Sequence, residues 1–375
     1  MQKSLGWFVV LTGCACTPTL RSAPISEPEP GQSAAPSYVK RSAARDPARL
    51  RGDWEVPSTL LIGWDSDWSE AVETIVAAGA SEVQMDVLFG EEQPEVEYEK
   101  QLFSLGANVI HLDLDTPWVR DYGPLQIHTA TGEARWLDAH YSFERARDDM
   151  LPQLLAPGFS AIVESMPLEV DGGAVIGNGE GLCAITDRSL GDAGLSPEDP
   201  DMDALLHTMG CDTLAVLPNL LDETTGHADV MAQFTAPDRV MVSQVDASTH
   251  PTDAAILDET VRVLQEAAAS RAKPLAVVRV PMHVSGKRYF SYVNGTPLRD
   301  HYLAPSFRTL SLDFEAKAHQ ALARAVGPRK LVSVPADAMV DRGGVIHCIT
   351  LGLKEANAVR ELDVGAADDG DEMPL

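Results

Sequence analysis

Cys348 is the residue with the clearest potential for chemistry, and it lies in the segment Asp341–Thr350, DRGGVIHCIT. A thiolate is a strong nucleophile, whereas a free cysteine in an apolar strand usually serves only as packing. Two glycines precede it, and glycine permits backbone angles and close ligand approach that other residues prevent. The pattern predicts a turn and then a short strand. Because side chains alternate along a strand, His347 is expected to point away from Cys348, so an acid/base partner must come from elsewhere.

Two other polar segments could supply that partner. The segment TPWVRDYGP, residues 116–124, holds Trp118 and Asp121 in a loop bounded by two prolines. The segment GHAD, residues 226–229, places His227 and Asp229 two residues apart, so an extended chain would turn both to one face. The purely structural alternatives are a salt bridge from Asp121 to its neighbour Arg120, and a hydrogen-bonded structural histidine.

A thiol, a histidine and two carboxylates suit chemistry on a guanidinium group. That group is planar, cationic and rich in donors, so carboxylates can bind it through paired hydrogen bonds. Its central carbon is a poor electrophile, which a thiolate can attack while the carboxylates hold the charge. A histidine can protonate the departing ammonia and then activate water.

These segments together resemble the family of agmatine deiminases and bacterial, porphyromonad-type peptidylarginine deiminases, within the guanidino-group-modifying, or pentein, superfamily. The similar stretches follow the order of the family across residues 54–353. They are Trp118–Pro124, Asp171–Ala174 followed by Gly179–Gly181, Gly226–Asp229, Ser291–Asn294 and Gly343–Cys348.

The resemblance implies an α/β fold, a five-bladed pentein propeller with pseudo-five-fold symmetry in a single domain, and an active site in the central channel. It implies a hydrolase that acts on carbon–nitrogen bonds of linear amidines through a covalent thiouronium, without cofactor or metal. The roles carried over by motif are Cys348 as nucleophile, His227 as general acid/base, Asp121 and Asp229 as guanidinium ligands, Asn294 near the nucleophile and Trp118 as a channel wall.

The substrate is suggested by Arg145 and Arg147. Porphyromonad-type peptidylarginine deiminases have a similar Arg-x-Arg pair, which implies binding of the carboxylate of a C-terminal arginine and conversion to citrulline. The alternative in the same class is an agmatine deiminase, which makes N-carbamoylputrescine for putrescine biosynthesis. Agmatine deiminases usually have Asn in place of Val345 and Glu in place of Asp171, which weakens that alternative. The purely structural alternative is that the two arginines belong to a solvated cluster of surface charges.

Alternatives of other classes are a non-catalytic envelope lipoprotein that binds guanidino ligands and a cysteine protease or acyltransferase. Two carboxylates suit a cation and not an oxyanion, which argues against the protease. The substrate is expected to be a small guanidino compound or an arginine-terminated peptide. The sequence does not predict an oligomeric state.

Alternating apolar strands and amphipathic helices must position these segments, in a mixed α/β pattern without a clear internal repeat. Expected strands are 59–64, 84–89, 108–114, 133–141, 161–166, 214–217, 239–245, 274–280, 330–334 and 345–353. Expected helices start at a Ser69 cap, cover 201–209, run from an Asp253 cap to about residue 269, and run from an Asp313 cap to Gly327.

The composition is that of a large globular protein with an acidic surface. The chain has 375 residues, 45% apolar and 23% charged, and its formal net charge is −27. Such a surface repels nucleic acid and attracts cations. Of the five cysteines, Cys183 and Cys211 could pair in an oxidising compartment and leave Cys348 free. No CxxC pair occurs in the sequence, which argues against a zinc knuckle.

Both ends of the chain differ from the middle. Residues 1–16 resemble a lipoprotein signal peptide whose Leu11–Cys14 stretch is similar to a lipobox with Cys14 as the lipidated residue. Residues 17–50 predict a disordered, proline-rich linker, 51–355 the catalytic domain and 356–375 an acidic tail. The sequence favours export to an outer membrane, held there only by the lipid, with a secreted or periplasmic protein as the alternative.

Overall fold

The computed structural model describes residues 37–42, 48–129, 134–141, 144–196, 199–271 and 274–354, which all belong to the unit Ala35–Leu375. The expected signal peptide with Cys14 and the acidic tail lie outside the described residues. Within those ranges, no helix combines the length and apolar character needed to cross a membrane.

Five sheets of the described chain share one pattern, which we call a blade. A first strand pairs antiparallel with a second, a helix follows, and a third strand returns parallel to the second. In blade 1 these are β20 (Thr350–Leu353), β3 (Thr59–Gly63), α1 (Ser69–Gly79) and β4 (Gln84–Phe89). In blade 2 they are β6 (Leu125–His128), β7 (Ala134–His140), α4 (Leu151–Phe159) and β8 (Ile162–Glu169).

The other three blades repeat the pattern. Blade 3 has β9 (Val175–Gly177), β10 (Leu182–Thr186), α5 (Asp187–Asp192), α6 (Met202–Thr208) and β11 (Thr213–Leu217). Blade 4 has β12 (Ala232–Ala236), β13 (Arg239–Gln244), α7 (Pro251–Ala268) and β14 (Ala276–Pro281). Blade 5 has β17 (Thr296–Pro297), β18 (His301–Ser306), α8 (Leu312–Val326) and β19 (Lys330–Pro335).

Additional elements extend the blades. In blade 1, α2 (Val96–Leu105) leads to a fourth strand, β5 (Ala107–His111). In blades 2 and 3, β2 (Arg49–Leu50) and β1 (Tyr38–Arg41) add an antiparallel strand each. The hairpin β15 (His283–Ser285) and β16 (Arg288–Phe290) precedes blade 5, α9 (Asp337–Val340) follows it, and the remaining short helices are η1 (Ser66–Trp68), α3 (Val119–Tyr122), η2 (Asp148–Met150), η3 (Gly172–Ala174) and η4 (Ala228–Val230).

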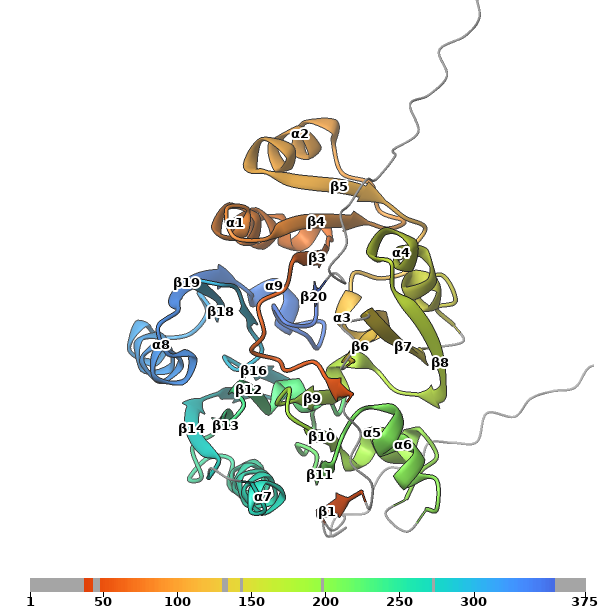
Figure 1. Ribbon diagram of the computed structural model, residues 1–375. Coiled ribbons are helices and arrows are strands. Elements are labelled where there is room, and N and C mark those ends of the chain that lie inside the picture. The colour runs from red at the N-terminus through yellow and green to blue at the C-terminus, as the bar shows by residue number, and fades with distance from the viewer. Residues whose placement is uncertain are drawn as a thin grey trace, which may run out of the picture. The chain divides into compact units, whose positions relative to one another are not determined.

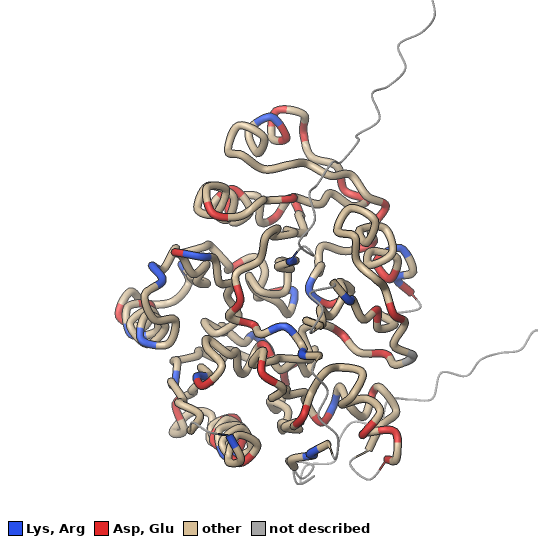
Figure 2. Tube along the Cα trace, in the orientation of Figure 1, with Lys and Arg blue, Asp and Glu red and all other residues tan. Residues whose placement is uncertain are grey.

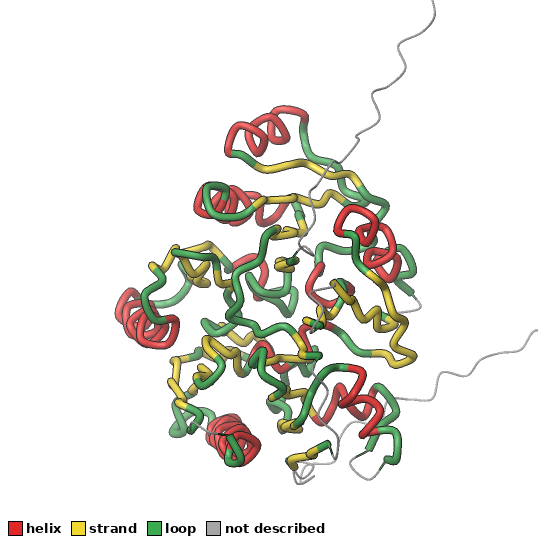
Figure 3. Tube along the Cα trace, viewed as in Figure 1, coloured by secondary structure: helices red, strands yellow, loops and turns green. Residues whose placement is uncertain are grey.

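Burial explains the radial order of these elements. The second strands β3 and β10 are buried at every residue, as expected for strands covered on both faces. The helices bury one stripe, for example Val72, Ile75 and Val76 of α1, and leave the other face to water. Figures 1 and 3 show the result, with α6, α7 and α8 at the periphery and β6, β9 and β20 toward the middle. The chain is therefore a five-bladed α/β propeller, and Figure 2 shows acidic residues on most of its blades.

The antiparallel pairing of the first and second strands determines at which end of the propeller their loops come together. In blade 1 the first residue of β20, Thr350, pairs with Ile62 near the end of β3. The loop that enters a first strand and the loop that leaves a second strand therefore meet at the same end of the blade. Ligand sites in open α/β sheets lie at the carboxyl ends of parallel strands for a similar reason.

Several predicted boundaries were wrong. β1 and β2 fall inside the segment 17–50 that was expected to be a disordered linker. Both strands are too short for a readable period, and pairing with blades 2 and 3 orders them. The strand predicted for 345–353 is confirmed only from Thr350, because the chain before it forms turns at residues 341–343 and 346–349, with Gly343 at a φ of +87°.

Three helix starts also differ from the prediction. Ser69 is the first residue of α1 and not its cap. Ser311, not Asp313, caps α8 by accepting from the Phe314 amide. Asp253 lies inside the first turn of α7, where its carboxylate accepts from the Leu221 amide and is therefore engaged by another segment.

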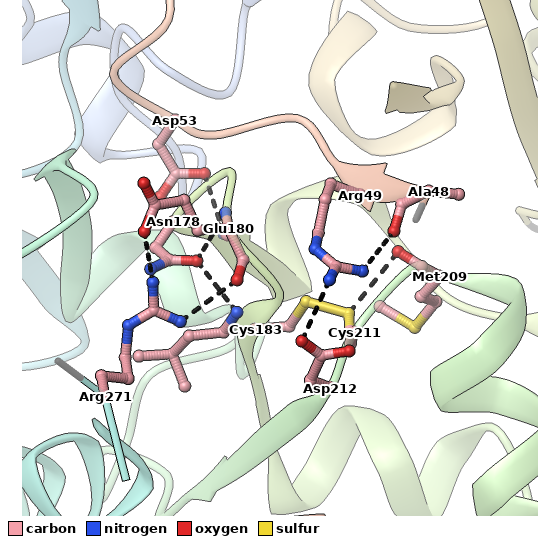
Figure 4. The surroundings of a disulfide bond; sticks show 12 residues. Ala48, Arg49, Asp53, Asn178, Glu180, Cys183, Met209, Cys211, Asp212 and Arg271 are labelled. Carbon is pink, nitrogen blue, oxygen red and sulfur yellow. Dashed lines mark hydrogen bonds and ion pairs between the residues drawn. A yellow bond between two sulfur atoms is a disulfide. The ribbon is translucent and has the colours of Figure 1, made fainter. Parts of the chain in front are cut away.

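A disulfide joins Cys183 of β10 to Cys211 in the loop that enters β11, with a Cα–Cα distance of 5.9 Å. Beside it, Arg49 donates to the Ala48 carbonyl and to Asp212 (Figure 4). The bond closes a loop across a sequence separation of 28 inside blade 3. Cys348 is left as a free, buried thiol, as the sequence suggested for an oxidising compartment.

Replacing both Cys183 and Cys211 by alanine is expected to lower the free energy of unfolding by about 3–4 kcal/mol, because a loop of this size gains that much chain entropy when it opens. The urea unfolding midpoint measures the loss, and the wild type in reductant should unfold at the same midpoint as the variant. Activity should persist, since neither residue lines the cavity described below. A variant as stable as the oxidised wild type would show that the bond does not form in solution.

Candidate active site

One short segment from each blade reaches the middle of the propeller. Each segment enters the first strand of its blade, so all five end at the same side of the ring. The side chains they carry are Asp121 before β6, Asp171 before β9, His227 and Asp229 before β12, Asn294 before β17 and Cys348 before β20. Residues almost 230 positions apart thus become neighbours because of the five-fold repeat.

Cys348 lies in the turn just before β20 and is 3% exposed. Its Sγ is 3.5 Å from the side-chain amide of Asn294 and 3.9 Å from Oδ2 of Asp229. Gly344 separates the Trp118 ring from Cys348, since a Cβ there would lie 2.5 Å from the ring and 3.1 Å from the Cys348 Cβ. Burial, with Asp229 and Asp121 nearby, raises the pKa of the Cys348 thiol well above its usual value. The group is therefore a neutral thiol at pH 7 until a cation approaches.

Asp229 is fully buried, and its two oxygens differ. Oδ2 accepts a hydrogen bond from Nδ1 of His347 at 2.7 Å, whereas Oδ1 has no hydrogen-bond partner among the described residues. Burial lowers the pKa of His347 to about 4, so this imidazole is neutral and donates to the carboxylate. Burial opposes ionisation of Asp229, but the bond from His347 and the charges of His227 and Arg120 lower its pKa. A buried anionic oxygen without a donor is costly, and a bound guanidinium would supply the missing donor.

His227 lies between two carboxylates. Its Nε2 is 3.0 Å from Oδ2 of Asp171, and its Nδ1 is 3.5 Å from Oδ1 of Asp121. Burial alone would lower the pKa of His227, but Asp121, Asp171 and Asp229 outweigh it and raise the pKa to about 10. The imidazole is therefore protonated at neutral pH and ready to act as an acid.

Asp121 faces the same centre from α3. Burial, together with the charges of Asp171 and Asp229, raises its pKa to about 7 although His227 opposes the shift. The amide of Gly173 donates to Oδ1 of Asp121 at 3.2 Å. A Cβ on Gly173 would lie 2.7 Å from both Asp121 Oδ1 and His227 Nδ1, so only glycine fits between these side chains.

A cavity of about 330 Å³ opens onto this cluster. It is large enough for a guanidino side chain together with part of the molecule that carries it. Its aromatic walls are Trp118 and Tyr141, and its polar lining includes three arginines. The lining residues are Trp118, Asp121, Tyr141, Arg145, Asp171, Arg188, Asp192, Thr224, Thr225, His227, Arg342, Gly343, Gly344 and Cys348.

The two arginines singled out in the sequence separate in the structure. Arg145 lines the cavity, where its Nη1 donates to the Tyr141 hydroxyl at 2.6 Å. Arg147 is outside the cavity lining and binds three carboxylates, those of Glu91, Asp113 and Asp115. Those acids follow β4 and β5, so Arg147 links the loops of blades 1 and 2. A two-arginine fork built from Arg145 and Arg147 does not form here.

Two residues of the cluster, His347 and Asp171, were not predicted from the sequence to take part in the site. His347 was expected to point away from Cys348 because the segment was read as a strand, yet in the turn both side chains approach Asp229 Oδ2. Asp171 was matched to a family segment without a role, and only the fold shows that it binds His227. The segment at His227 is not extended either, since residues 228–230 form η4 and give His227 and Asp229 different partners.

The cluster can bind a planar cation between Asp121 and Asp229, present a sulfur nucleophile and supply a proton from His227. Among the described residues, no group of three His, Cys, Asp or Glu side chains is arranged to hold a metal ion.

A model of the Porphyromonas-type peptidyl-arginine deiminase family matches residues 49–353. The chain belongs to this family. It is therefore a hydrolase acting on guanidino carbon–nitrogen bonds, which sets aside the binder-only and protease alternatives. Within the family, a protein from Latilactobacillus sakei that is named provisionally as an agmatine deiminase is 23% identical over 363 residues, 83% of this chain and 97% of the relative.

Solved structures of family deiminases share the fold. The agmatine deiminase of Enterococcus faecalis superposes with a TM-score of 0.72 at 21% identity, covering 84% of this chain and all of that one. A substrate-bound cysteine-to-serine variant of the C. jejuni agmatine deiminase gives a TM-score of 0.67 at 16% identity, covering 82% and 97% of the two chains. At these identities the likeness establishes the fold, the pentein propeller, and not the substrate.

Proposed function

We propose that this deiminase acts on arginine with a free α-carboxylate, as a C-terminal residue of a peptide or as the free amino acid, and yields citrulline and ammonia. One observation carries the proposal. Arg145 lines the catalytic cavity, and among the described residues it forms no ion pair; its guanidinium contacts the hydroxyl and ring of Tyr141, while the charges of Asp148 and Asp171 act on it from beyond ion-pair distance. A cavity arginine that forms no ion pair with a carboxylate of the protein can bind an anionic part of the ligand.

The first half of the reaction forms the covalent intermediate. The guanidinium lies between Asp121 and Asp229 and donates to the free Oδ1 of Asp229. Its charge lowers the cost of ionising Cys348, whose proton passes to the water of the cavity. Sγ then adds to the central guanidinium carbon. Protonated His227 gives its proton to the departing nitrogen, the carbon–nitrogen bond breaks, and ammonia leaves a thiouronium on Cys348.

The second half consumes water. Neutral His227 now takes one proton from a water molecule, and the oxygen adds to the thiouronium carbon. The carbon–sulfur bond breaks, the ureido product forms, and the second proton of the water returns to the sulfur. His227 and Cys348 are thereby restored to their resting protonation states. Asp171, bonded to Nε2 of His227, keeps the imidazole oriented through both steps.

Agmatine is the second candidate substrate, because the relatives described above carry the name agmatine deiminase, one of them provisionally. Agmatine has no carboxylate, and its amine would meet Arg145 at the cavity wall. Side-by-side assays of ammonia release with agmatine, free arginine and arginine-terminated peptides test the proposal. A wild-type preference for agmatine would overturn it.

Replacing Arg145 by glutamine is expected to lower kcat/KM about 10- to 100-fold for a peptide that ends in arginine with a free carboxylate, because a charged hydrogen bond is lost. For the same peptide with an amidated C-terminus the loss should stay below about 3-fold, since no carboxylate is present to bind. Comparison of the two substrates separates carboxylate recognition from general damage. Equal losses would mean that Arg145 only shapes the cavity.

The proposal includes export and lipid anchoring at Cys14. The disulfide in blade 3 supports an oxidising compartment, where such bonds persist. Replacing Cys14 by serine is expected to move the protein from the membrane fraction to the soluble fraction or to block processing. Fatty-acid labelling that fails to mark the wild type would refute the anchor and leave the enzymology untouched.

A further inference from the structure

Arg188 occupies in blade 3 the place that Arg145 occupies in blade 2. Arg145 lies in the loop that leaves the second strand β7, and Arg188 lies in α5, directly after the second strand β10. Loops that leave second strands reach the end of the propeller that carries the catalytic cluster. Both arginines line the catalytic cavity.

The stem of Arg188 is fixed beside the segment of His227. A Cβ on Gly226 would lie 2.7 Å from the Arg188 Cδ, so the glycine allows the arginine stem to pack against this backbone. The hydroxyl of Thr186, the cap of α5, donates to the Gly226 carbonyl at 2.5 Å. These contacts place Arg188 next to the residue that precedes His227, and they leave its guanidinium outside the core.

The guanidinium of Arg188 is loosely held. Its Nη1 is 3.4 Å from the Glu223 carbonyl, and its Nε is 3.7 Å from Asp192, four residues along the same short helix. The Arg188 and Asp192 side chains are 46% and 69% exposed, and an exposed pair of this kind is worth less than about 1 kcal/mol. A carboxylate brought by a ligand can displace such a partner at little cost.

The other cavity arginine and Arg147 are already engaged. Arg342 forms ion pairs with Asp65 and Asp67 and lies 5.1 Å above the Trp68 ring. Arg147 binds three carboxylates outside the cavity. Of the arginines that line the cavity, Arg145 and Arg188 are therefore the two whose charge is available to a ligand.

We propose that Arg188, and not Arg147, is the second arm of the carboxylate subsite, so that Arg145 from blade 2 and Arg188 from blade 3 bind the α-carboxylate of the substrate. The inference rests on the proposed function and specifies which residues bind the carboxylate. Two guanidinium groups from neighbouring blades can each donate paired hydrogen bonds to one carboxylate. An arginine in the cavity would thus be held by its guanidinium at Asp121 and Asp229 and by its carboxylate at the wall formed by blades 2 and 3.

The test compares Arg188→Gln with Arg147→Gln as the matched control, on one peptide that ends in arginine with a free or an amidated C-terminus. Arg188→Gln is expected to lower kcat/KM for the free acid about 10- to 100-fold, mainly through KM, and to change the amide less than about 3-fold. Arg147→Gln should affect both peptides alike. Arg188→Lys keeps the charge and should recover part of the loss on the free acid.

The outcomes separate the inference from the proposed function. A wild type that prefers the free acid, with a selective loss in Arg147→Gln and none in Arg188→Gln, overturns the inference and leaves the proposed function standing. Equal losses on both peptides in Arg188→Gln also overturn it, since they show a structural role. A wild type that does not distinguish the free acid from the amide overturns both.

Discussion

Cys348→Ala is expected to abolish deimination while the protein remains folded. The substitution removes one sulfur atom from a turn, and the contacts that position this turn, such as the bond from the Arg120 amide to the Cys348 carbonyl, are made by the backbone. Without Sγ no covalent intermediate can form, and loss of a nucleophile of this kind costs on the order of 10⁴- to 10⁶-fold in kcat. Release of ammonia and formation of the ureido product measure the effect.

The variant should still bind substrate, because the carboxylates and His227 stay in place. Protection of the variant against thermal unfolding by an arginine-terminated peptide tests this directly. Activity above about 1% of the wild type, in a preparation free of wild-type enzyme, would contradict a cysteine mechanism.

Asp229→Asn should produce the second large effect. The amide has the size of the carboxylate and can still accept from His347 Nδ1, but it carries no charge to offset a buried guanidinium. Removing one partner of a buried ion pair costs about 3–5 kcal/mol, which corresponds to roughly two to four powers of ten in kcat/KM. Asp121→Asn is expected to lose a comparable amount, since Asp121 faces the same cation.

Asp258→Asn provides the control, because Asp258 is an exposed acid of α7 that pairs with Arg279. Its kcat/KM should equal that of the wild type. The melting temperature of Asp229→Asn should change little if the bond to His347 survives. A near-normal kcat/KM for Asp229→Asn would mean that the guanidinium binds elsewhere.

Many strands and helices of the propeller could be predicted, because each depends on a local pattern of apolar and polar residues in its own segment. The strand at 84–89 is confirmed without change as β4, and the predicted strands near 59, 239 and 330 are β3, β13 and β19 within one or two residues. The fold itself came from the resemblance of ordered motifs. No local pattern predicted that β20 would pair with β3 or that β1 would join blade 3.

The main residues of the site could be predicted from residue type. The predictions failed for residues whose partners come from distant segments of the chain. Cys348, His227, Asp121 and Asp229 are brought to one centre, as the motifs suggested. The sequence around Arg147 gives no sign of its ion-pair partners, because the three carboxylates belong to loops of blade 1. His347 was assigned to the wrong face because two glycines and tertiary packing replaced the expected strand with turns.

The closure of blade 1 by its last strand has a consequence for biosynthesis. During translation β3 is synthesised early. Its partner β20 is synthesised only after every other blade has been made. Until then β3 has an unpaired edge on that side, the ring is open, and the nucleophile that immediately precedes β20 has not been incorporated. A chain that ends before Cys348 and β20 thus lacks the nucleophile and cannot act as a deiminase.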